Sequence, residues 1–279
     1  MIKLDNTLLL GHRGARSEAL ENTLFGFEHA YKLQAQGLSG VEFDVQLTAD
    51  GHLVIFHDET LQRLCGLQSR VDQLSLIEIQ RQLQLGHKIM TLDMLAQSMT
   101  YSSTIFSQPQ VPKDLVTQVT ETTKIAKTQN HKITLPALTQ FTHIELEIKT
   151  HNRTNYSKLI QALIRYLVGT PLASLPIVLT TFDVQLLAQL QCNKLLANIP
   201  RGLLVRTPHS IVSAPNTALQ LGCTQLGIHY PLITKSIIQN AHRYGLPVSA
   251  WTVNDIEIAK KLVEWQVDVI ITDIPSQLL

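Results

Sequence analysis

The sequence predicts an α/β fold in which parallel strands and helices alternate to form a (β/α)8 barrel. Short apolar runs alternate with amphipathic segments from one end of the chain to the other, which is the pattern of βα units packed into a parallel sheet. The length of 279 residues and the hydrophobic content of 44% allow one large barrel with a sizeable core. We therefore expect residues 1–279 to form a single barrel domain.

Nine segments are expected to be strands, which is one more than an eight-stranded barrel needs. The extra strand is expected at residues 53–56, because the preceding sequence Thr-Ala-Asp-Gly at 48–51 is typical of a turn. This segment would form a short return arm beside the strand at 41–47. The nine segments are 7–10, 41–47, 53–56, 144–148, 177–181, 202–205, 225–228, 248–252 and 267–271.

Helices are expected after most of these strands, and one long segment departs from the alternation. Residues 100–142 are rich in threonine and glutamine and contain no glycine, so we interpret them as an insertion with a short helix at 115–127. The helix before it indicates that it begins at the end of the barrel opposite the active site, and we assign it no role in substrate binding. The expected helices are 23–36, 155–167, 183–191, 208–221, 234–244 and 255–264.

Composition indicates a small-molecule substrate. The 23 basic and 22 acidic residues nearly cancel, which argues against nucleic acid or an anionic membrane surface as the main partner. The three cysteines, Cys65, Cys192 and Cys223, are widely separated and are expected to be reduced thiols. The short N-terminus leaves no room for a signal peptide, and no apolar run approaches the roughly 20 residues of a membrane span. We expect a cytoplasmic protein without stable membrane insertion.

Paired carboxylates in the second predicted strand indicate a cation site. Glu42 and Asp44 are two residues apart, so both point to one face of the strand while the apolar residues between and around them point to the other. In a barrel the acids would face the interior, where two carboxylates are costly unless a divalent cation compensates them. The alternative is a solvated strand edge.

A second predicted strand also carries two carboxylates on one face. Glu145, Glu147 and Lys149 share one face between aliphatic neighbours. Several carboxylates without clustered cysteines or paired histidines favour Mg²⁺ or Ca²⁺ over Zn²⁺. Lys149 would supply a positive charge for phosphate beside the metal, unless it is an ordinary exposed lysine past a strand end.

Two histidines follow apolar runs that are expected to be strands. His12 and His57 each end such a run, and barrel enzymes place their chemistry at the carboxyl ends of the strands. Cleavage of a phosphodiester needs a base for the attacking oxygen and an acid for the leaving oxygen, and imidazole suits both roles near neutral pH. The guanidinium of Arg13 could bind two phosphate oxygens at once. Gly14 permits the sharp backbone turn that is needed if the adjacent residues His12 and Arg13 are both to reach the mouth of the barrel.

The ordered series of motifs resembles the glycerophosphodiester phosphodiesterase family along nearly the whole chain. The resemblance departs from the family pattern at Leu20, where a proline is usual, at Thr181, where a serine is common, and at 266–269. The motifs are Gly-His-Arg-Gly-Ala at 11–15, Glu-Asn-Thr at 21–23, Val-Glu-Phe-Asp-Val at 41–45, His-Asp at 57–58, Thr-Leu-Asp at 91–93, Leu-Glu-Ile-Lys at 146–149, Thr-Phe at 181–182, Gly-Leu-Pro-Val at 245–248, Ala-Trp-Thr-Val-Asn at 250–254 and Val-Ile-Ile-Thr-Asp-Ile-Pro at 269–275.

The resemblance implies a distorted (β/α)8 TIM barrel that hydrolyses glycerophosphodiesters to sn-glycerol 3-phosphate and an alcohol. It implies an acid/base pair of His12 and His57 and a divalent cation, Mg²⁺ or Ca²⁺, held by Glu42, Asp44 and Glu147. Residues that would contact the substrate are Arg13 and Lys149 at the phosphate, Trp251 and Phe182 as apolar walls over the glycerol, and Asn22, His229 and Asn254 at the rim. The alternative for the two aromatic residues is core packing.

Several alternatives stay open at this point. The reaction can proceed through a cyclic phosphate or by direct attack of water, and Glu145 can be a ligand, an orienting group or a partner of Lys149. The substrate can instead be a lysophospholipid, as for a lysophospholipase D, or another lipid phosphodiester. A non-catalytic barrel that binds a phosphate ligand is the alternative outside enzymes, although it has no need of a paired acid and base. The protein can be a monomer or a homodimer.

Overall fold

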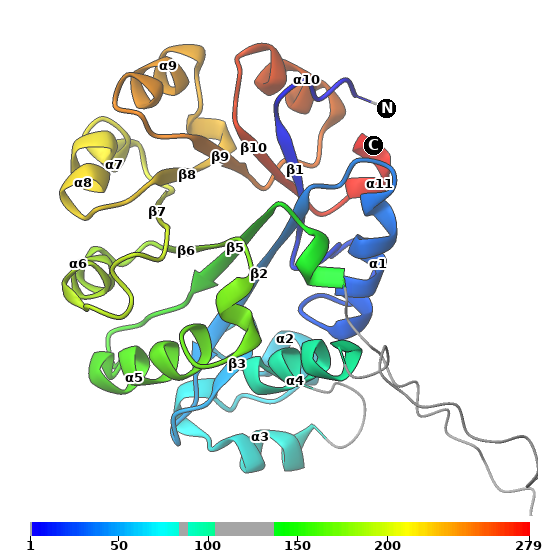
Figure 1. The fold of residues 1–279 in the computed structure, drawn as a ribbon, viewed down its shortest axis with the longest axis vertical. Coiled ribbons are helices and arrows are strands. Elements are labelled where there is room, and N and C mark those ends of the chain that lie inside the picture. The colour runs from blue at the N-terminus through cyan, green and yellow to red at the C-terminus, as the bar shows by residue number, and fades with distance from the viewer. Residues whose placement is uncertain (1, 84–88, 104–136) are drawn as a thin grey trace, which may run out of the picture.

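The computed structural model describes residues 2–83, 89–103 and 137–279, and in these residues eight parallel strands close into a barrel surrounded by helices (Figure 1). The barrel closes because β1 pairs with both β10 and β2. The predicted α/β barrel is confirmed, with strand ends that differ by one or two residues. Its strands are β1 (Leu8–His12), β2 (Gly40–Leu47), β5 (His143–Ile148), β6 (Ile177–Thr181), β7 (Arg201–Val205), β8 (Gln225–His229), β9 (Val248–Trp251) and β10 (Val269–Thr272).

The extra predicted strand is a side arm, as expected. β3 (Leu53–Ile55) runs antiparallel to β2, and it pairs in turn with β4 (Met90–Thr91), which the sequence did not predict. Between them lie α2 (Gln62–Cys65), the 3₁₀ turn η1 (Val71–Gln73) and α3 (Leu76–Gln82). A small core separate from the main one holds this arm together, with Phe56, Leu61 and Ile79 buried in it.

The outer helices begin where side-chain oxygens cap them. The cap residues Thr23, Asn155, Asp183, Thr234 and Asp255 each accept a hydrogen bond from a backbone N–H of the following first turn. The capped helices are α1 (Leu24–Gln34), α5 (Tyr156–Leu167), α6 (Val184–Cys192), α9 (Lys235–Arg243) and α10 (Ile256–Glu264). Further outer elements are α4 (Leu92–Ser103), α11 (Pro275–Leu278) and the short 3₁₀ turns η3 (Ala137–Gln140), η4 (Pro171–Ser174) and η5 (Tyr230–Leu232).

One predicted helix was wrong. Residues 208–221 form two short helices, α7 (Pro208–Ile211) and α8 (Ala214–Gln220), instead of one. The break has a local cause, because Pro215 has no N–H to donate and fits only in the first turn of a helix. The helix predicted at 115–127, and most of the insertion that contains it, lie outside the described residues.

The acidic residues of the barrel interior lie on two neighbouring strands. The register of β2 and β5 places Glu42 beside Glu145 and Asp44 beside Glu147, so all four carboxylates face inward. Next to β2 the wall becomes apolar, because Leu10, Val269 and Ile271 form a small buried cluster on β1 and β10. The sequence alternation thus concentrates the interior charge on two neighbouring strands.

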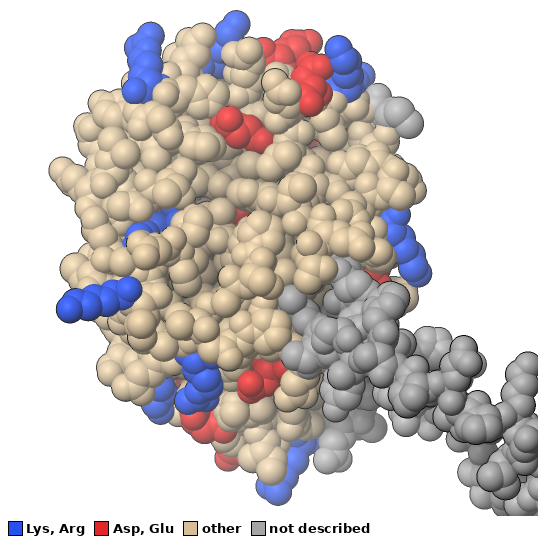
Figure 2. All heavy atoms as spheres, in the orientation of Figure 1, with Lys and Arg blue, Asp and Glu red and all other residues tan. Residues whose placement is uncertain are grey.

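The two ends of the chain meet beside β1 (Figure 1). The amide of Ile2 donates to the carbonyl oxygen of Leu278 at 3.0 Å. Charges of both signs are scattered around the face seen in Figure 2 and do not form a patch of one sign. Within the described ranges, no helix has the length and apolar character that crossing a bilayer requires.

Candidate active site

The structure brings the three predicted metal ligands together at the carboxyl ends of β2 and β5. One carboxylate oxygen from each of Glu42, Asp44 and Glu147 lies within 4.8 Å of the other two. Glu42 and Asp44 are buried, and Oε1 of Glu42 has no hydrogen-bond partner among the described residues. An all-oxygen set with an unsatisfied buried oxygen fits a hard divalent cation such as Mg²⁺ or Ca²⁺. These residues are therefore suited to hold the ion that the sequence predicted.

The carboxylates of this cluster repel one another when no cation is bound. Burial, together with the neighbouring charges of Asp44 and Glu147, holds the pKa of Glu42 well above its usual value. Burial also raises the pKa of Glu147. Burial acts in the same sense on Asp44, but the nearby charges of Lys149, His57 and Arg13 outweigh it and lower the pKa of Asp44. A divalent cation would favour the ionised form of all three groups.

Lys149 reaches into this cluster from the end of β5. Its Nζ lies 2.9 Å from Oδ1 of Asp44 and 2.5 Å from Oε1 of Glu147. The side chain is 21% exposed, so it is not an ordinary surface lysine. The ammonium group is thus placed beside the acidic oxygens, where a phosphate bound at the cluster would meet it.

Arg13 and Asn22 lie behind the cluster and hold Asp44. Both are buried in the loop after β1, and both adopt a positive φ, 52° for Arg13 and 55° for Asn22. Nε of Arg13 lies 3.2 Å from Oδ2 of Asp44, and Nδ2 of Asn22 donates to the same oxygen at 3.0 Å. Gly14 permits this sharp loop, because it has a φ of 94° and a Cβ there would lie 2.9 Å from the backbone of Gly26.

Glu21 fixes the guanidinium of Arg13. It accepts hydrogen bonds from Arg13 at 2.8 Å and from both terminal nitrogens of Arg63 at 2.8 and 2.7 Å. Burial opposes its ionisation, but the hydrogen bonds from Arg63 and Arg13 outweigh this effect and lower the pKa of Glu21 to about 2. Glu21 thus connects the loop after β1 to the side arm that carries Arg63.

Replacing Glu21 by glutamine should destabilise the protein in a pH-dependent way. The folded-state pKa of about 2 lies below the usual 4.5, so the stabilisation is present above pH 4.5 and is lost as the pH falls toward 2. We expect Glu21→Gln to lower the free energy of unfolding by about 2 kcal/mol at pH 7. Urea denaturation at pH 7 and pH 3 measures this difference, which should shrink at pH 3.

The control for this prediction is Glu257→Gln on α10. Glu257 pairs with Lys260 at 2.7 Å on an exposed surface, so its loss should cost less than about 0.5 kcal/mol at either pH. An equal effect of Glu21→Gln at pH 7 and pH 3 would contradict the ionic origin of the stabilisation.

His12, at the end of β1, is held by a chain of polar groups. Its Nδ1 lies 2.5 Å from Oδ1 of Asp273, and Oδ2 of Asp273 accepts from Nδ2 of Asn254 at 2.7 Å. A carboxylate at Nδ1 favours a proton there and leaves Nε2 to face the site, 3.7 Å from Glu42. Burial lowers the pKa of His12 and so favours the neutral imidazole, although the hydrogen bond that His12 donates to Asp273 acts in the opposite sense.

His57, just after β3, is held in the same way. Its Nδ1 lies 2.6 Å from Oδ1 of Asp58, whose Oδ2 accepts from Nε of Arg63 at 2.6 Å. Burial lowers the pKa of His57 as well. The side arm therefore contributes a residue to the site, because it places His57 at the carboxyl end of the barrel.

The predicted aromatic residues meet at the mouth. The rings of Phe182 and Trp251 are edge to face with centroids 5.6 Å apart, and His229 lies 5.1 Å from Trp251 on the other side. Gly227, next to Trp251, makes room for Leu204 of β7, since a Cβ there would lie 2.4 Å from the Leu204 side chain. Of the three predicted rim residues, His229 contacts this aromatic group, whereas the side chains of Asn22 and Asn254 are engaged with Asp44 and Asp273.

Two residues of the site were missed by sequence reasoning. Asp273 was part of a quoted motif, but no local pattern links it to a histidine 261 positions away. Arg206 directly follows β7, and its guanidinium lies 4.8 Å from the centroid of the Phe182 ring. Its only sequence signal is a charged residue at the carboxyl end of a barrel strand.

Glu145 is buried one layer deeper and accepts from Gln225 at 2.6 Å, so it lies outside the three-oxygen cluster.

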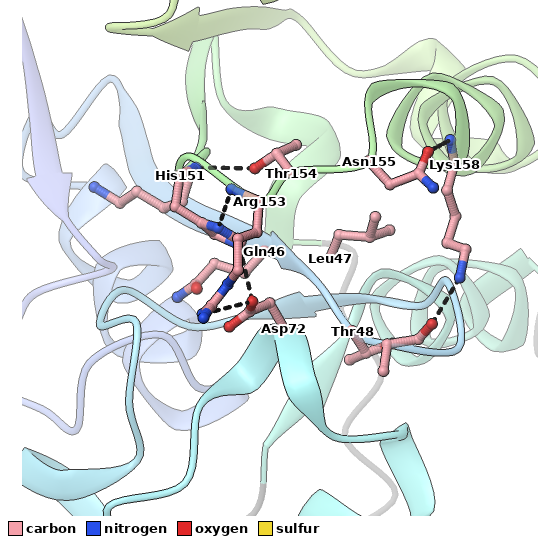
Figure 3. A pocket seen from close by; sticks show the side chains of 11 residues that line it. Gln46, Leu47, Thr48, Asp72, His151, Arg153, Thr154, Asn155 and Lys158 are labelled. Carbon is pink, nitrogen blue, oxygen red and sulfur yellow. Dashed lines mark hydrogen bonds and ion pairs between the residues drawn. The ribbon is translucent and has the colours of Figure 1, made fainter.

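A polar pocket of about 200 Å³ lies between the loop after β5 and the side arm (Figure 3). Asp72 reaches across it to Arg153 at 3.1 Å and to His151 at 3.4 Å, and Lys158 donates to the carbonyl oxygen of Ala49 at 2.7 Å. These contacts occupy the charged groups that line the pocket. We interpret the contacts across this pocket as structural, because they fix the loop that follows Lys149.

A barrel whose mouth combines an acidic cluster, two oriented histidines and cationic side chains is equipped for phosphodiester hydrolysis. The model of the glycerophosphoryl diester phosphodiesterase family matches residues 12–277, and the chain belongs to this family. The predicted family, the predicted barrel fold and the prediction of a glycerophosphodiester phosphodiesterase are confirmed.

Known proteins resemble the chain over nearly its full length. A glycerophosphodiester phosphodiesterase of Caldanaerobacter subterraneus subsp. tengcongensis is 26% identical over 276 residues, which cover 98% of this chain and 96% of the relative. Two solved structures share the fold. A glycerophosphodiester phosphodiesterase of Thermotoga maritima has a TM-score of 0.66 at 22% identity, with 97% and 96% coverage of this chain and of that chain. A phosphodiesterase of Oleispira antarctica in complex with the product sn-glycerol-3-phosphate has a TM-score of 0.71 at 22% identity, with 97% and 94% coverage.

Proposed function

We propose that the protein hydrolyses glycerophosphodiesters to sn-glycerol 3-phosphate and an alcohol, with a divalent cation and two histidines. The observation that carries the proposal is the convergence of Glu42, Asp44 and Glu147 within 4.8 Å, beside two histidines that carboxylates orient. The bound cation, Mg²⁺ or Ca²⁺, would neutralise negative charge on the phosphoryl oxygens as it develops. The product bound to the Oleispira antarctica phosphodiesterase is consistent with this substrate class.

The histidines take complementary roles in this proposal. A carboxylate holds Nδ1 of both His12 and His57, which leaves Nε2 of each for chemistry, so one can accept the proton of the attacking oxygen and the other can protonate the leaving oxygen. The lowered pKa of both histidines favours the neutral imidazole that the base requires. Lys149, which lies 2.9 Å from Asp44, would contact a phosphoryl oxygen of a bound substrate, and Arg13 holds Asp44 in place.

Release of glycerol 3-phosphate from glycerophosphocholine and from the diester of two glycerols tests this function. We expect turnover in the presence of Mg²⁺ or Ca²⁺ and its loss in the presence of a chelator. Absence of turnover with both diesters and both metals would contradict the proposed activity. Turnover that survives complete removal of metal would contradict the role of the cation while leaving the substrate class intact.

A further inference from the structure

Two spaces of different size flank the acidic cluster. The smaller, about 30 Å³, is lined by His12, Glu147 and Trp251. The larger, about 380 Å³, is lined by His57, Glu147, Phe182 and Arg206. Glu147 borders both spaces, so a diester whose phosphate lies at the cluster would have the larger space beside it.

The sizes of the two spaces decide which of them can take a substituent of the phosphate. The smaller space has room for about two water molecules, which is too little for glycerol or another alcohol. The larger space has room for the alcohol that leaves, which differs from one substrate to the next, and Phe182 and Arg206 would face it there. Phe182 lies between the two, with its edge contact to Trp251 at 5.6 Å and Arg206 at 4.8 Å.

Arg206 gives the larger space an uncompensated positive charge. The carboxylates that line this space are each paired with a cation, since Asp58 binds Arg63, Glu59 binds Arg70 and Glu147 binds Lys149, at 2.5 to 2.6 Å. Arg206 is exposed, and among the described residues it makes no ion pair within 4.0 Å. The guanidinium of Arg206 contacts the Phe182 ring. Without Arg206, this ring could attract the quaternary ammonium of choline.

We propose that Arg206 makes the enzyme prefer head groups that are neutral polyols or anions over cationic ones such as choline. This proposal rests on the proposed function. A guanidinium can donate hydrogen bonds to hydroxyl or carboxylate oxygens of the leaving alcohol. It repels an ammonium group in the same space, and it competes with that group for the aromatic ring.

The test is the ratio of kcat/KM for the diester of two glycerols to kcat/KM for glycerophosphocholine. We expect Arg206→Gln to lower this ratio about fivefold and Arg206→Glu to lower it further, because each change weakens or inverts the charge that the head group meets. The matched control is Arg243→Gln at the end of α9, which removes the same charge from a helix end away from the larger space and should leave the ratio unchanged.

Two results would overturn the proposal while the proposed function stands. One is an active enzyme whose ratio is the same in wild type and in both Arg206 variants. The other is an equal fall of kcat/KM for both diesters in Arg206→Gln, which would assign Arg206 to the phosphate that both substrates share. A wild type that is inactive on both diesters with either metal would overturn the proposed function, and the head-group proposal with it.

Discussion

His12→Ala should lower kcat for glycerol 3-phosphate release by about 1,000-fold, because general acid/base catalysis contributes between 10²-fold and 10⁴-fold. The imidazole lies at the end of β1 with its side chain 12% exposed, and Asp273 at 2.5 Å directs its Nε2 toward the acidic cluster. Steady-state kinetics at saturating metal measures the loss. Thermal unfolding and metal titration of the same variant should be close to wild type, since the change removes the proposed proton carrier and retains Glu42, Asp44 and Glu147.

The control is His242→Ala on α9, whose imidazole also pairs with an aspartate, Asp268 at 2.7 Å, but away from the acidic cluster. Its kcat should equal that of the wild type. Asp273→Asn adds a finer comparison. Because it removes the charge that orients His12 and keeps the histidine itself, we expect kcat to fall about 10-fold to 100-fold with KM unchanged. If His12→Ala had the kcat of the wild type, the proposed role of His12 as one of the two acid/base residues would be wrong.

The barrel strands could be predicted because their signal is local. A buried parallel strand is a short apolar run between turn residues, and Ile177–Thr181 was predicted with the bounds that the structure has. β4 escaped because it has two residues, Met90 and Thr91, and forms only by pairing with β3. Such a strand depends on a tertiary contact and has no periodicity of its own.

The acidic cluster could be predicted for a similar reason, whereas its supporting residues could not. Glu42 and Asp44 alternate with apolar residues on one strand, so their common direction follows from strand geometry. Closure of the barrel brings Asp273 to His12 across 261 positions, and pairing of β6 with β7 brings Arg206 to Phe182 across 24 positions. Both contacts depend on how strands pair in the folded protein, which no local pattern specifies.

Glu42→Gln should weaken metal binding on the order of 100-fold, because it removes one unit of negative charge from the site that the cation would occupy. Calorimetric titration with Mg²⁺ or Ca²⁺ measures the change, and activity should fall with metal occupancy. The fold should tolerate the substitution. Burial and the charges of Asp44 and Glu147 raise the pKa of Glu42 in the metal-free protein, so a neutral amide resembles the group that it replaces.

Glu42→Gln should have opposite effects on stability in the metal-free and the metal-bound protein. Without metal, the thermal midpoint should be equal to or higher than that of the wild type, because one repulsive carboxylate is absent. With metal, the wild type should gain about 2.7 kcal/mol at a concentration 100 times its Kd, and the variant should gain far less at that concentration. Thermal unfolding with chelator and with excess metal measures both states.

The matched control is Glu145→Gln, which neutralises a second buried carboxylate on the same wall of the barrel. Glu145 accepts from Gln225 at 2.6 Å, and it lies outside the cluster in which Glu42, Asp44 and Glu147 approach within 4.8 Å. If those three residues are the ligands, Glu145→Gln should bind metal with nearly the wild-type Kd. Equal weakening by both variants would instead show that metal affinity follows the total interior charge, and the three-residue ligand set would then be wrong.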